Sequence, residues 1–316
     1  MDRSGRVRPD PDLIPVRRTG TVCTDVDAFA GTTAYDLDLP PGRIRYYRAG
    51  TSGPPIILLH GGVLDSSELA YGEVVPRLAR DYQLYVLDWP EHGHSWPWSA
   101  GTTEADLGDV LGRMIEHWGL DRINLVGMSQ GGGIAVRYAI DHPDRVDRVI
   151  AIGPVGFEDR RWVLTLMRIA VRLPRAPQLV TRLLAQWPSL VRLAMRTART
   201  HDTSSVGFDE AVASGHDQAE QALRHGTTIV DDYLYQAYCR RQDLVDYRPE
   251  AHRLTVPTLI VQGSKDHSTS RRALLRAAAA MPSGGYRRVN GVGHLSCRDD
   301  PGAMADVIRE FMASGR

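Results

Sequence analysis

The stretch that decides the fold is Gly127-Met128-Ser129-Gln130-Gly131. It lies between an apolar run at 123–127, predicted to be a strand, and a helix predicted over 132–142. Glycine at both ends permits a turn too tight for larger side chains, and the serine is held in a strained backbone conformation with its hydroxyl exposed. Because the pattern falls between a strand and a helix, it predicts that Ser129 is a nucleophile rather than part of a plain glycine-rich turn.

Similar apolar runs recur along the chain and alternate with helical stretches. Besides 123–127, the predicted strands are Ala34–Leu39, Arg43–Arg48, Pro55–His60, Tyr82–Asp88, Val146–Ile152, Val256–Gln262 and Tyr286–Asn290. The predicted helices are Ser66–Arg80, Thr103–Trp118, Gly132–His142, Ser270–Ala280 and Pro301–Ala313. Continuous apolar strands separated by helices are typical of a parallel sheet that is covered on both faces. The sequence therefore predicts an α/β fold.

The alternation stops between Gly156 and Pro249. Apolar residues at helical spacing, without a clear buried strand, predict an inserted helical subdomain there. We therefore divide the chain into a flexible arm at 1–30, a core domain at 31–156 and 250–316, and a helical cap at 157–249. Residues 157–201 carry nine arginines and two acidic residues, whereas 202–250 carry four arginines and ten acidic residues. The basic half has two interpretations. In one, its arginines lie on the solvent face of the cap helices; in the other, they form a patch that binds a membrane surface or an acidic substrate.

Composition and charge exclude several classes of protein. The 316 residues carry 38 basic and 38 acidic side chains, and this net charge of zero argues against a nucleic-acid partner. The chain has no run of about 18 apolar residues, so we expect no membrane-spanning helix. Its start is polar and lacks the apolar segment of a secretory signal, and its three cysteines show no metal-ligand spacing. We expect a cytoplasmic protein without a metal site or a disulfide framework.

A serine nucleophile needs a base, and the base needs an acid that orients it. His294 ends the glycine-rich segment Gly291–His294 after the last predicted strand, and it is the candidate base. Asp266 follows the predicted strand Val256–Gln262 and is the candidate acid. Glu158 or Asp159, which follow the predicted strand Val146–Ile152, could supply the acid instead.

Two backbone N–H groups are expected to stabilise the negative charge that develops on the substrate oxygen. One belongs to Gln130, at the start of a helix whose dipole favours negative charge. The other comes from His60-Gly61-Gly62-Val63, where glycines let the backbone approach a ligand closely. We favour the N–H of Gly62, with that of Val63 as the alternative one residue further on.

These features together resemble the α/β-hydrolase superfamily, in which the serine, the acid and the histidine follow one another in that order along the chain. Here the order is Ser129, Asp266 and His294, and the resemblance covers roughly 34–314. It implies a mostly parallel sheet of eight strands, with helices on both faces and a helical cap inserted after the sixth strand. The insertion at 157–249 falls at that point. The resemblance also implies that no metal or organic cofactor is required.

Departures from the superfamily's patterns argue against some of the activities found in it. The nucleophile is a serine, whereas the haloalkane dehalogenases and epoxide hydrolases of this superfamily use a carboxylate. Leu295 follows the histidine, at a position where hydrolases of carbon–carbon bonds usually carry tryptophan. The segment Asp88–Ser95 resembles the family's D-x-P-G-H-G-x-S loop, with Glu91 in place of the first glycine. We interpret Asp88, His92 and Ser95 in this loop as structural.

The resulting prediction is a serine hydrolase that cleaves an ester, lactone or related acyl bond of a small molecule through an acyl-enzyme. The substrate is expected to contact residues beside the nucleophile, the base and the oxyanion loop, namely His60, Gly61, Val63, Met128 and Leu295. Two alternatives stay open: a non-hydrolytic or carbon–carbon-cleaving enzyme of the same fold, and a ligand receptor on a hydrolase scaffold. The sequence leaves the substrate and the oligomeric state open.

Overall fold

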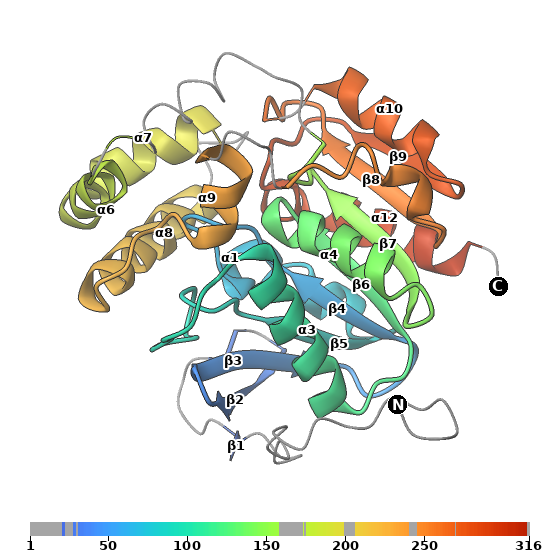
Figure 1. Cartoon of the computed structure of the whole chain (residues 1–316), viewed down its shortest axis with the longest axis horizontal. Coiled ribbons are helices and arrows are strands. Elements are labelled where there is room, and N and C mark those ends of the chain that lie inside the picture. Colours follow the sequence, from blue (N-terminus) through green and yellow to red (C-terminus); the bar gives the residue numbers. More distant parts are fainter. Residues whose placement is uncertain are drawn as a thin grey trace, which may run out of the picture.

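One β-sheet with helices on both of its faces forms the centre of the computed structural model (Figure 1). The structure describes residues 21–22, 28–29, 31–157, 173, 175–198, 206–239, 245–268 and 270–314. Within these residues the sheet has nine strands, in the order β1-β2-β3-β5-β4-β6-β7-β8-β9. They are β1 (Thr21–Val22), β2 (Thr33–Leu39), β3 (Gly42–Ala49), β4 (Pro55–Leu59), β5 (Gln83–Leu87), β6 (Ile123–Met128), β7 (Val146–Ile152), β8 (Thr258–Gly263) and β9 (Gly284–Val289).

The strand directions confirm the predicted α/β fold. Every neighbouring pair from β5 to β9 is parallel, and the three pairs from β1 to β5 are antiparallel. Strands β2 to β9 are the eight that we expected. β1 is an addition from the arm at 1–30, which was expected to be flexible. It covers part of the exposed backbone edge of β2, and nearby Phe29 is buried with its ring centroid 4.7 Å from that of Tyr47. The rest of this arm lies outside the described residues, and the flexibility of the arm stays a prediction.

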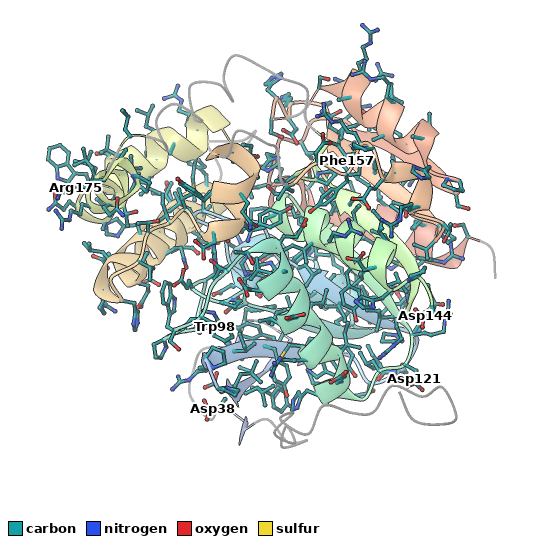
Figure 2. The ribbon with its side chains drawn as sticks, in the orientation of Figure 1. Asp38, Trp98, Asp121, Asp144, Phe157 and Arg175 are labelled. Carbon is teal, nitrogen blue, oxygen red and sulfur yellow. The ribbon has the colours of Figure 1, made fainter. Side chains whose placement is uncertain are left out.

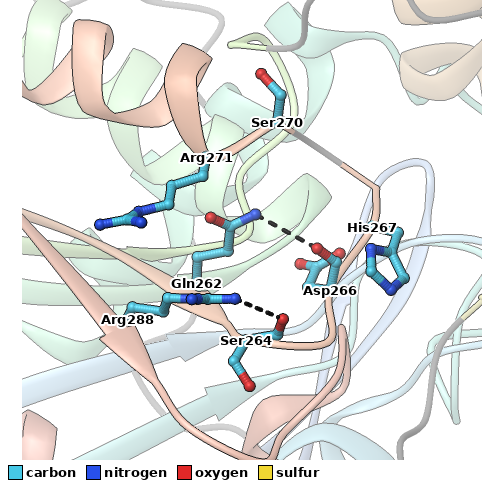
Figure 3. A pocket seen from close by; sticks show the side chains of 8 residues that line it. Gln262, Ser264, Asp266, His267, Ser270, Arg271 and Arg288 are labelled. Carbon is cyan, nitrogen blue, oxygen red and sulfur yellow. Dashed lines mark hydrogen bonds between the residues drawn. The ribbon is translucent and has the colours of Figure 1, made fainter.

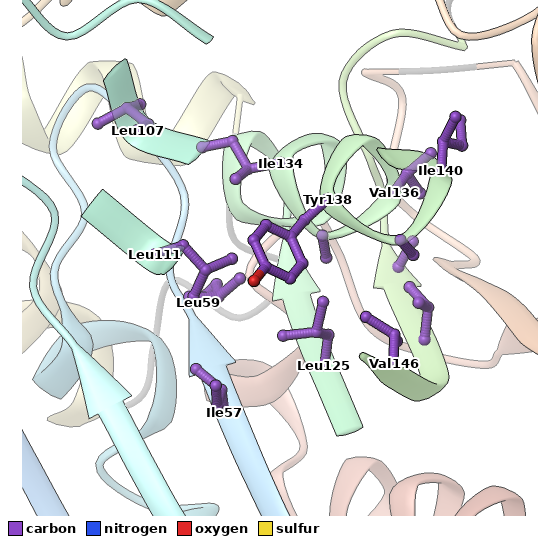
Figure 4. Close-up of a cluster of buried hydrophobic side chains, with 14 of the residues drawn as sticks. Ile57, Leu59, Leu107, Leu111, Leu125, Ile134, Val136, Tyr138, Ile140 and Val146 are labelled. Atoms are coloured by element: carbon purple, nitrogen blue, oxygen red, sulfur yellow. The ribbon is translucent and has the colours of Figure 1, made fainter. Parts of the chain in front are cut away.

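Successive side chains of the central strands enter two separate apolar cores. Ile57 and Leu59 of β4 pack with α3 and α4 (Figure 4), whereas Ile56 and Leu58 face α1, α2 and α12. All four side chains are fully buried, because helices cover both faces of the sheet, and this is why the strands read as continuous apolar runs. The helices of the core domain are α1 (Ser67–Tyr71), α2 (Val75–Leu78), α3 (Glu104–Trp118), α4 (Gln130–Asp141), α10 (Arg271–Ala280), α11 (Ser296–Asp299) and α12 (Pro301–Ala313), with a 3₁₀ turn at Ala251–Arg253.

Four helices in the described residues lie between β7 and β8, at the point where the insertion was expected, and we refer to them as the cap. They are α6 (Ala176–Gln186), α7 (Pro188–Ala198), α8 (Val206–Arg224) and α9 (Asp232–Cys239). Helices α6, α7 and α8 share an apolar cluster into which Leu64, Leu69 and Trp96 of the core domain also pack. Arg192 of α7 pairs with Asp209 of α8, so the basic and acidic halves of the insertion meet. No helix in the described part of the chain is long and apolar enough to cross a membrane.

Candidate active site

The nucleophile elbow lies between β6 and α4. Ser129 has φ 54° and ψ −114°, a backbone conformation that residues other than glycine rarely adopt. A Cβ atom at Gly127 would lie 2.2 Å from the carbonyl oxygen of Gly131, and one at Gly131 would lie 2.3 Å from that of Leu59. Both positions therefore require glycine, for the steric reason that the sequence pattern suggests.

Backbone hydrogen bonds hold the strained turn in place. The N–H of Ser129 donates to the carbonyl of Ile152 over 2.8 Å, and the carbonyl of Ser129 accepts from the N–H of Val155 over 3.1 Å. The N–H of Gly131 donates to the carbonyl of His60 over 3.1 Å. The elbow is thus tied to the ends of β7 and β4, and the side chain of Ser129 stays partly exposed.

Asp266 and His294 form the second part of the site, in the loops after β8 and β9. Oδ2 of Asp266 accepts a hydrogen bond from Nδ1 of His294 over 2.9 Å, and Oδ1 accepts from the N–H and the hydroxyl of Ser268 over 2.8 and 2.6 Å. Burial raises the pKa of Asp266, but the charge of His294 and the hydrogen bonds from His294 and Ser268 outweigh burial and lower it to about 2. The carboxylate therefore stays ionised at neutral pH, and its hydrogen bond to Nδ1 favours the His294 tautomer that a general base would need. The alternative acids, Glu158 and Asp159, lie outside the described residues.

The Asp266–His294 pair and the turn at Ser129 both lie beside the end of β7. A Cβ atom at Gly153 would lie 2.9 Å from Oδ2 of Asp266 and 3.1 Å from Nδ1 of His294. Gly153 directly follows Ile152, whose carbonyl accepts the N–H of Ser129. Among the residues that the structure describes, the Ser129 hydroxyl and the His294 ring share no direct hydrogen bond, and bonds of this kind often form fully only with substrate bound.

The loop after β4 lies beside the nucleophile. A Cβ atom at Gly61 would lie 3.3 Å from Cβ of Ser129, and one at Gly62 would lie 2.1 Å from Oε1 of Gln130. Gln130 begins α4, so its backbone N–H has no acceptor within the helix, and the helix dipole adds positive potential there. Val63, the next residue of the loop, has φ 66°, which is a left-handed backbone conformation. The structure therefore brings together the two residues from which we expect oxyanion donors.

Three of the predicted substrate contacts, His60, Met128 and Leu295, have buried side chains. His60 accepts the N–H of Trp89 at Nε2 over 3.0 Å, and its Nδ1 donates to the carbonyl of Gly61 over 2.6 Å. Burial lowers the pKa of His60 to about 3, so the ring is neutral and fixes the loop. Met128 and Leu295 are each 1% exposed and pack on the face covered by α1, α2 and α12. Contact of these three side chains with the substrate stays a prediction.

The loop that resembles the family's D-x-P-G-H-G-x-S segment is held by buried hydrogen bonds. Asp88 accepts the N–H groups of Ser67 and His94 over 2.9 and 3.0 Å, and the Ser95 hydroxyl donates to the Asp88 carbonyl over 2.8 Å. These contacts support the structural interpretation of the loop. Glu91, which replaces the glycine, has φ 64°, and this positive value explains why a glycine suits the position.

Asp231, directly before α9, is a site residue that the sequence analysis missed. Its carboxylate accepts the side-chain amide of Gln130 over 2.6 Å and the N–H of Leu234 over 2.9 Å. Burial raises the pKa of Asp231, and the electrostatic influence of His92 and these two donors lower it in part. No local pattern could have revealed the contact, since Asp231 and Gln130 are 101 residues apart along the chain.

A cavity of about 210 Å³ lies beside the candidate acid (Figure 3). Its lining consists of Gln262, Gly263, Ser264, Asp266, His267, Ser270, Arg271 and Arg288. The side-chain amide of Gln262 donates to the backbone carbonyl of Asp266 over 3.4 Å, and the guanidinium of Arg288 donates to that of Ser264 over 3.0 Å. Both bonds fasten the loop after β8, so this wall of the cavity holds the acid in position.

Two known proteins show how the sequence compares. The dihydrolipoyllysine-residue acetyltransferase component of the acetoin cleaving system of Cupriavidus necator is 37% identical over 140 residues. That match covers 44% of this chain and only 37% of the relative, so the chain spans little more than a third of the relative's length. A 2-hydroxy-6-oxononadienedioate/2-hydroxy-6-oxononatrienedioate hydrolase of Dechloromonas aromatica is 24% identical over 281 residues, which cover 88% of this chain and 92% of that protein.

Structural and family comparisons agree with the architecture. The solved enol-lactonase from Burkholderia xenovorans LB400 superposes with a TM-score of 0.65 at 20% identity, covering 88% of this chain and 100% of that one. At this identity the likeness shows the fold alone. The family model described as alpha/beta hydrolase fold matches residues 54–301, from β4 to the start of the last helix. This chain therefore belongs to the alpha/beta hydrolase fold family.

Proposed function

We propose that this protein is a serine hydrolase that cleaves an ester, a lactone or a related acyl bond. One observation carries the proposal: a serine in a strained strand-to-helix turn lies near a buried histidine–carboxylate pair whose carboxylate stays ionised. Ser129 attacks the carbonyl carbon while Nε2 of His294 takes its proton. Asp266 stabilises the imidazolium that forms.

The tetrahedral intermediate carries a negative oxygen that needs hydrogen-bond donors. The backbone N–H groups of Gln130 and Gly62, or Val63 in place of Gly62, are the donors that we propose. Removing one donor of this kind costs about 2.7–4 kcal/mol in the barrier. His294 then gives its proton to the leaving group, and a water molecule activated by His294 hydrolyses the acyl-enzyme.

The bond that is cleaved has two candidates. The first is an ester or lactone, which Leu295 favours because carbon–carbon hydrolases of this fold usually carry tryptophan at that position. The second candidate is cleavage of a carbon–carbon bond beside a carbonyl, as the name of the Dechloromonas aromatica relative indicates for that protein. A product assay with enol esters, lactones and 2-hydroxy-6-oxo-dienoates separates the two.

The experiment that tests the proposal is intact mass measurement after incubation with a fluorophosphonate. We expect a single adduct on the wild-type protein and none on Ser129→Ala, because only an activated serine reacts rapidly. Folding of both proteins is checked by circular dichroism. A folded wild-type protein without an adduct would count against the proposal, as would an adduct that persists in the variant.

A further inference from the structure

An apolar surface faces solvent on the two outer helices of the cap. Nine large apolar side chains are exposed in the described part of the chain, and six of them lie between 173 and 193. These six are 37–57% exposed: Leu173, Leu179, Val180, Leu183, Trp187 and Leu193. Figure 1 shows α6 and α7 at the outer edge of the cap, away from the sheet. Clusters of this kind mark surfaces that bind a partner.

The exposed residues of α6 form one stripe. Leu179, Leu183 and Trp187 are four residues apart and Val180 lies beside this row, so together they cover an arc of about 100°. The opposite side of the helix, which includes Ala185, is buried in the apolar cluster of the cap, and Leu184 beside it belongs to the same cluster. Helix α6 is therefore apolar on two sides, and only one of them is covered by the protein.

Arginines accompany the stripe, and acidic residues do not. The stretch 173–198 contains Arg175, Arg182, Arg192 and Arg196 and no aspartate or glutamate. Figure 2 shows Arg175 at the outer tip of the cap. Arg192 pairs with Asp209 of α8, whereas neither Arg182 nor Arg196 has an ion-pair partner among the described residues. An apolar stripe bordered by cations is typical of helices that lie in a membrane interface.

We propose that the exposed face of α6 and α7 binds the surface of an anionic lipid bilayer. The leucines and Trp187 would enter the boundary between headgroups and acyl chains, and the arginines would meet lipid phosphates. A second copy of the chain fits this face poorly, because a symmetric contact would bring the same arginines together without an acid opposite them. Nucleic acid would neutralise the arginines but leave the leucines in water. The inference goes beyond the proposed hydrolase activity and does not depend on it.

Vesicle flotation tests the proposal with the full chain. The Ser129→Ala protein serves as the parent throughout, so that cleavage of lipid cannot alter the vesicles. We expect it to float with vesicles of phosphatidylcholine and phosphatidylglycerol in equal parts, to stay unbound with phosphatidylcholine alone, and to dissociate as salt is added. Leu179→Ser combined with Leu183→Ser should weaken binding about tenfold or more, and Arg182→Gln combined with Arg196→Gln should do the same.

The matched control is Leu275→Ser. Leu275 is 41% exposed on α10, where it stands among arginines but alone as an exposed apolar residue, so this change should leave flotation unaltered. Absence of flotation with the anionic vesicles would overturn the proposal, as would an equal loss with Leu275→Ser. A dimer seen by light scattering that the Leu179 and Leu183 changes dissociate would assign the face to a second copy and also overturn it.

Discussion

The side-chain amide of Gln130 donates a hydrogen bond to the carboxylate of Asp231 over 2.6 Å, and this contact joins the nucleophile elbow to the cap. Gln130 is 0% and Asp231 4% exposed, so solvent does not compete for the bond. The same carboxylate caps α9 through the N–H of Leu234. The carbonyl end of the Gln130 amide lies against the loop at Gly62. One buried side chain therefore contacts the cap and both segments from which we expect oxyanion donors.

Asp231→Ala should lower kcat by about tenfold to a hundredfold while KM changes little. Without the carboxylate, the buried amide of Gln130 loses its acceptor and no longer fixes the spacing of the elbow and the Gly62 loop. An interaction that acts on the oxyanion affects the transition state rather than substrate binding. Steady-state kinetics with an activated ester measure this split. Asp231→Asn, whose amide oxygen can still accept a hydrogen bond, should retain most of the activity.

Asp232→Ala is the matched control for this prediction. The carboxylate of Asp232 accepts the N–H of Thr102 over 3.1 Å, so it also links α9 to the core domain. Thr102 is far along the chain from Ser129 and Gln130 of the elbow. We expect its kcat to stay within about twofold of wild type, the size of a remote effect. Equal losses in the two variants would mean that docking of the cap, rather than the position of Gln130, controls the rate.

Ser129→Ala and Ser129→Gly should both abolish turnover, by at least about a thousandfold, because the members of a triad act as a unit. Their stabilities should differ. Alanine keeps the strain at φ 54°, whereas glycine relieves it and should raise the free energy of unfolding by about 1 kcal/mol relative to alanine. Urea unfolding of the two inactive variants measures this difference. A less stable glycine variant would show that the turn stores no strain.

Asp266→Asn should reduce turnover by about four orders of magnitude, since the amide favours the wrong histidine tautomer. The folded-state pKa of Asp266 is about 2, below the ordinary 3.8. Its ionised form therefore adds stability above about pH 4 that is lost as the pH falls towards 2, and the variant lacks this contribution. Unfolding measured at about pH 7 and pH 3 should show a stability gap between wild type and variant that narrows on acidification.

Normal turnover of Asp266→Asn would move the acid elsewhere. Glu158→Gln and Asp159→Asn would then be the variants to examine, because these residues follow the end of β7 in the sequence. A loss in either one, together with an active Asp266→Asn, would identify the acid that orients His294. A loss in none of the three would count against a carboxylate-assisted mechanism.

Local sequence was enough to predict the strained turn at Ser129 and the proximity of Asp266 to His294. Gly127 and Gly131 are required by atoms that lie close along the chain or in the next strand, so the pattern itself carries the geometry. Asp266 and His294 were predictable because the ends of parallel strands gather at one edge of a sheet, where ligand sites form. The 2.9 Å contact between them follows from that topology.

The burial of residues next to the catalytic candidates was harder to predict from the sequence. Met128 and Leu295 adjoin Ser129 and His294 in sequence, and on that basis we expected them at the substrate. Met128 ends β6, where successive side chains point to opposite faces of the sheet, and both Met128 and Leu295 are buried in the apolar core. Asp231 was missed for another reason, because its contact with Gln130 depends on how the cap docks and leaves no local signal.

Glu91→Gln should change how stability depends on pH. Burial, followed by the nearby charges of Asp231 and Asp232, raises the pKa of Glu91 from 4.5 to about 7. The folded protein holds this proton up to about pH 7, whereas the unfolded chain releases it near 4.5, so the wild-type protein loses stability as the pH rises between these values. The glutamine variant keeps an uncharged side chain and should escape this loss.

The Tm of Glu91→Gln should therefore match that of wild type at about pH 4 and exceed it at about pH 8, where the wild-type carboxylate is ionised close to two other acids. Glu73→Gln serves as the control, because the side chain of Glu73 is 58% exposed and pairs with Arg77 on the surface. The Tm difference between Glu73→Gln and wild type should not increase from about pH 4 to about pH 8. Tm curves for Glu91→Gln and wild type that run parallel across this range would show that Glu91 titrates as an ordinary surface carboxylate.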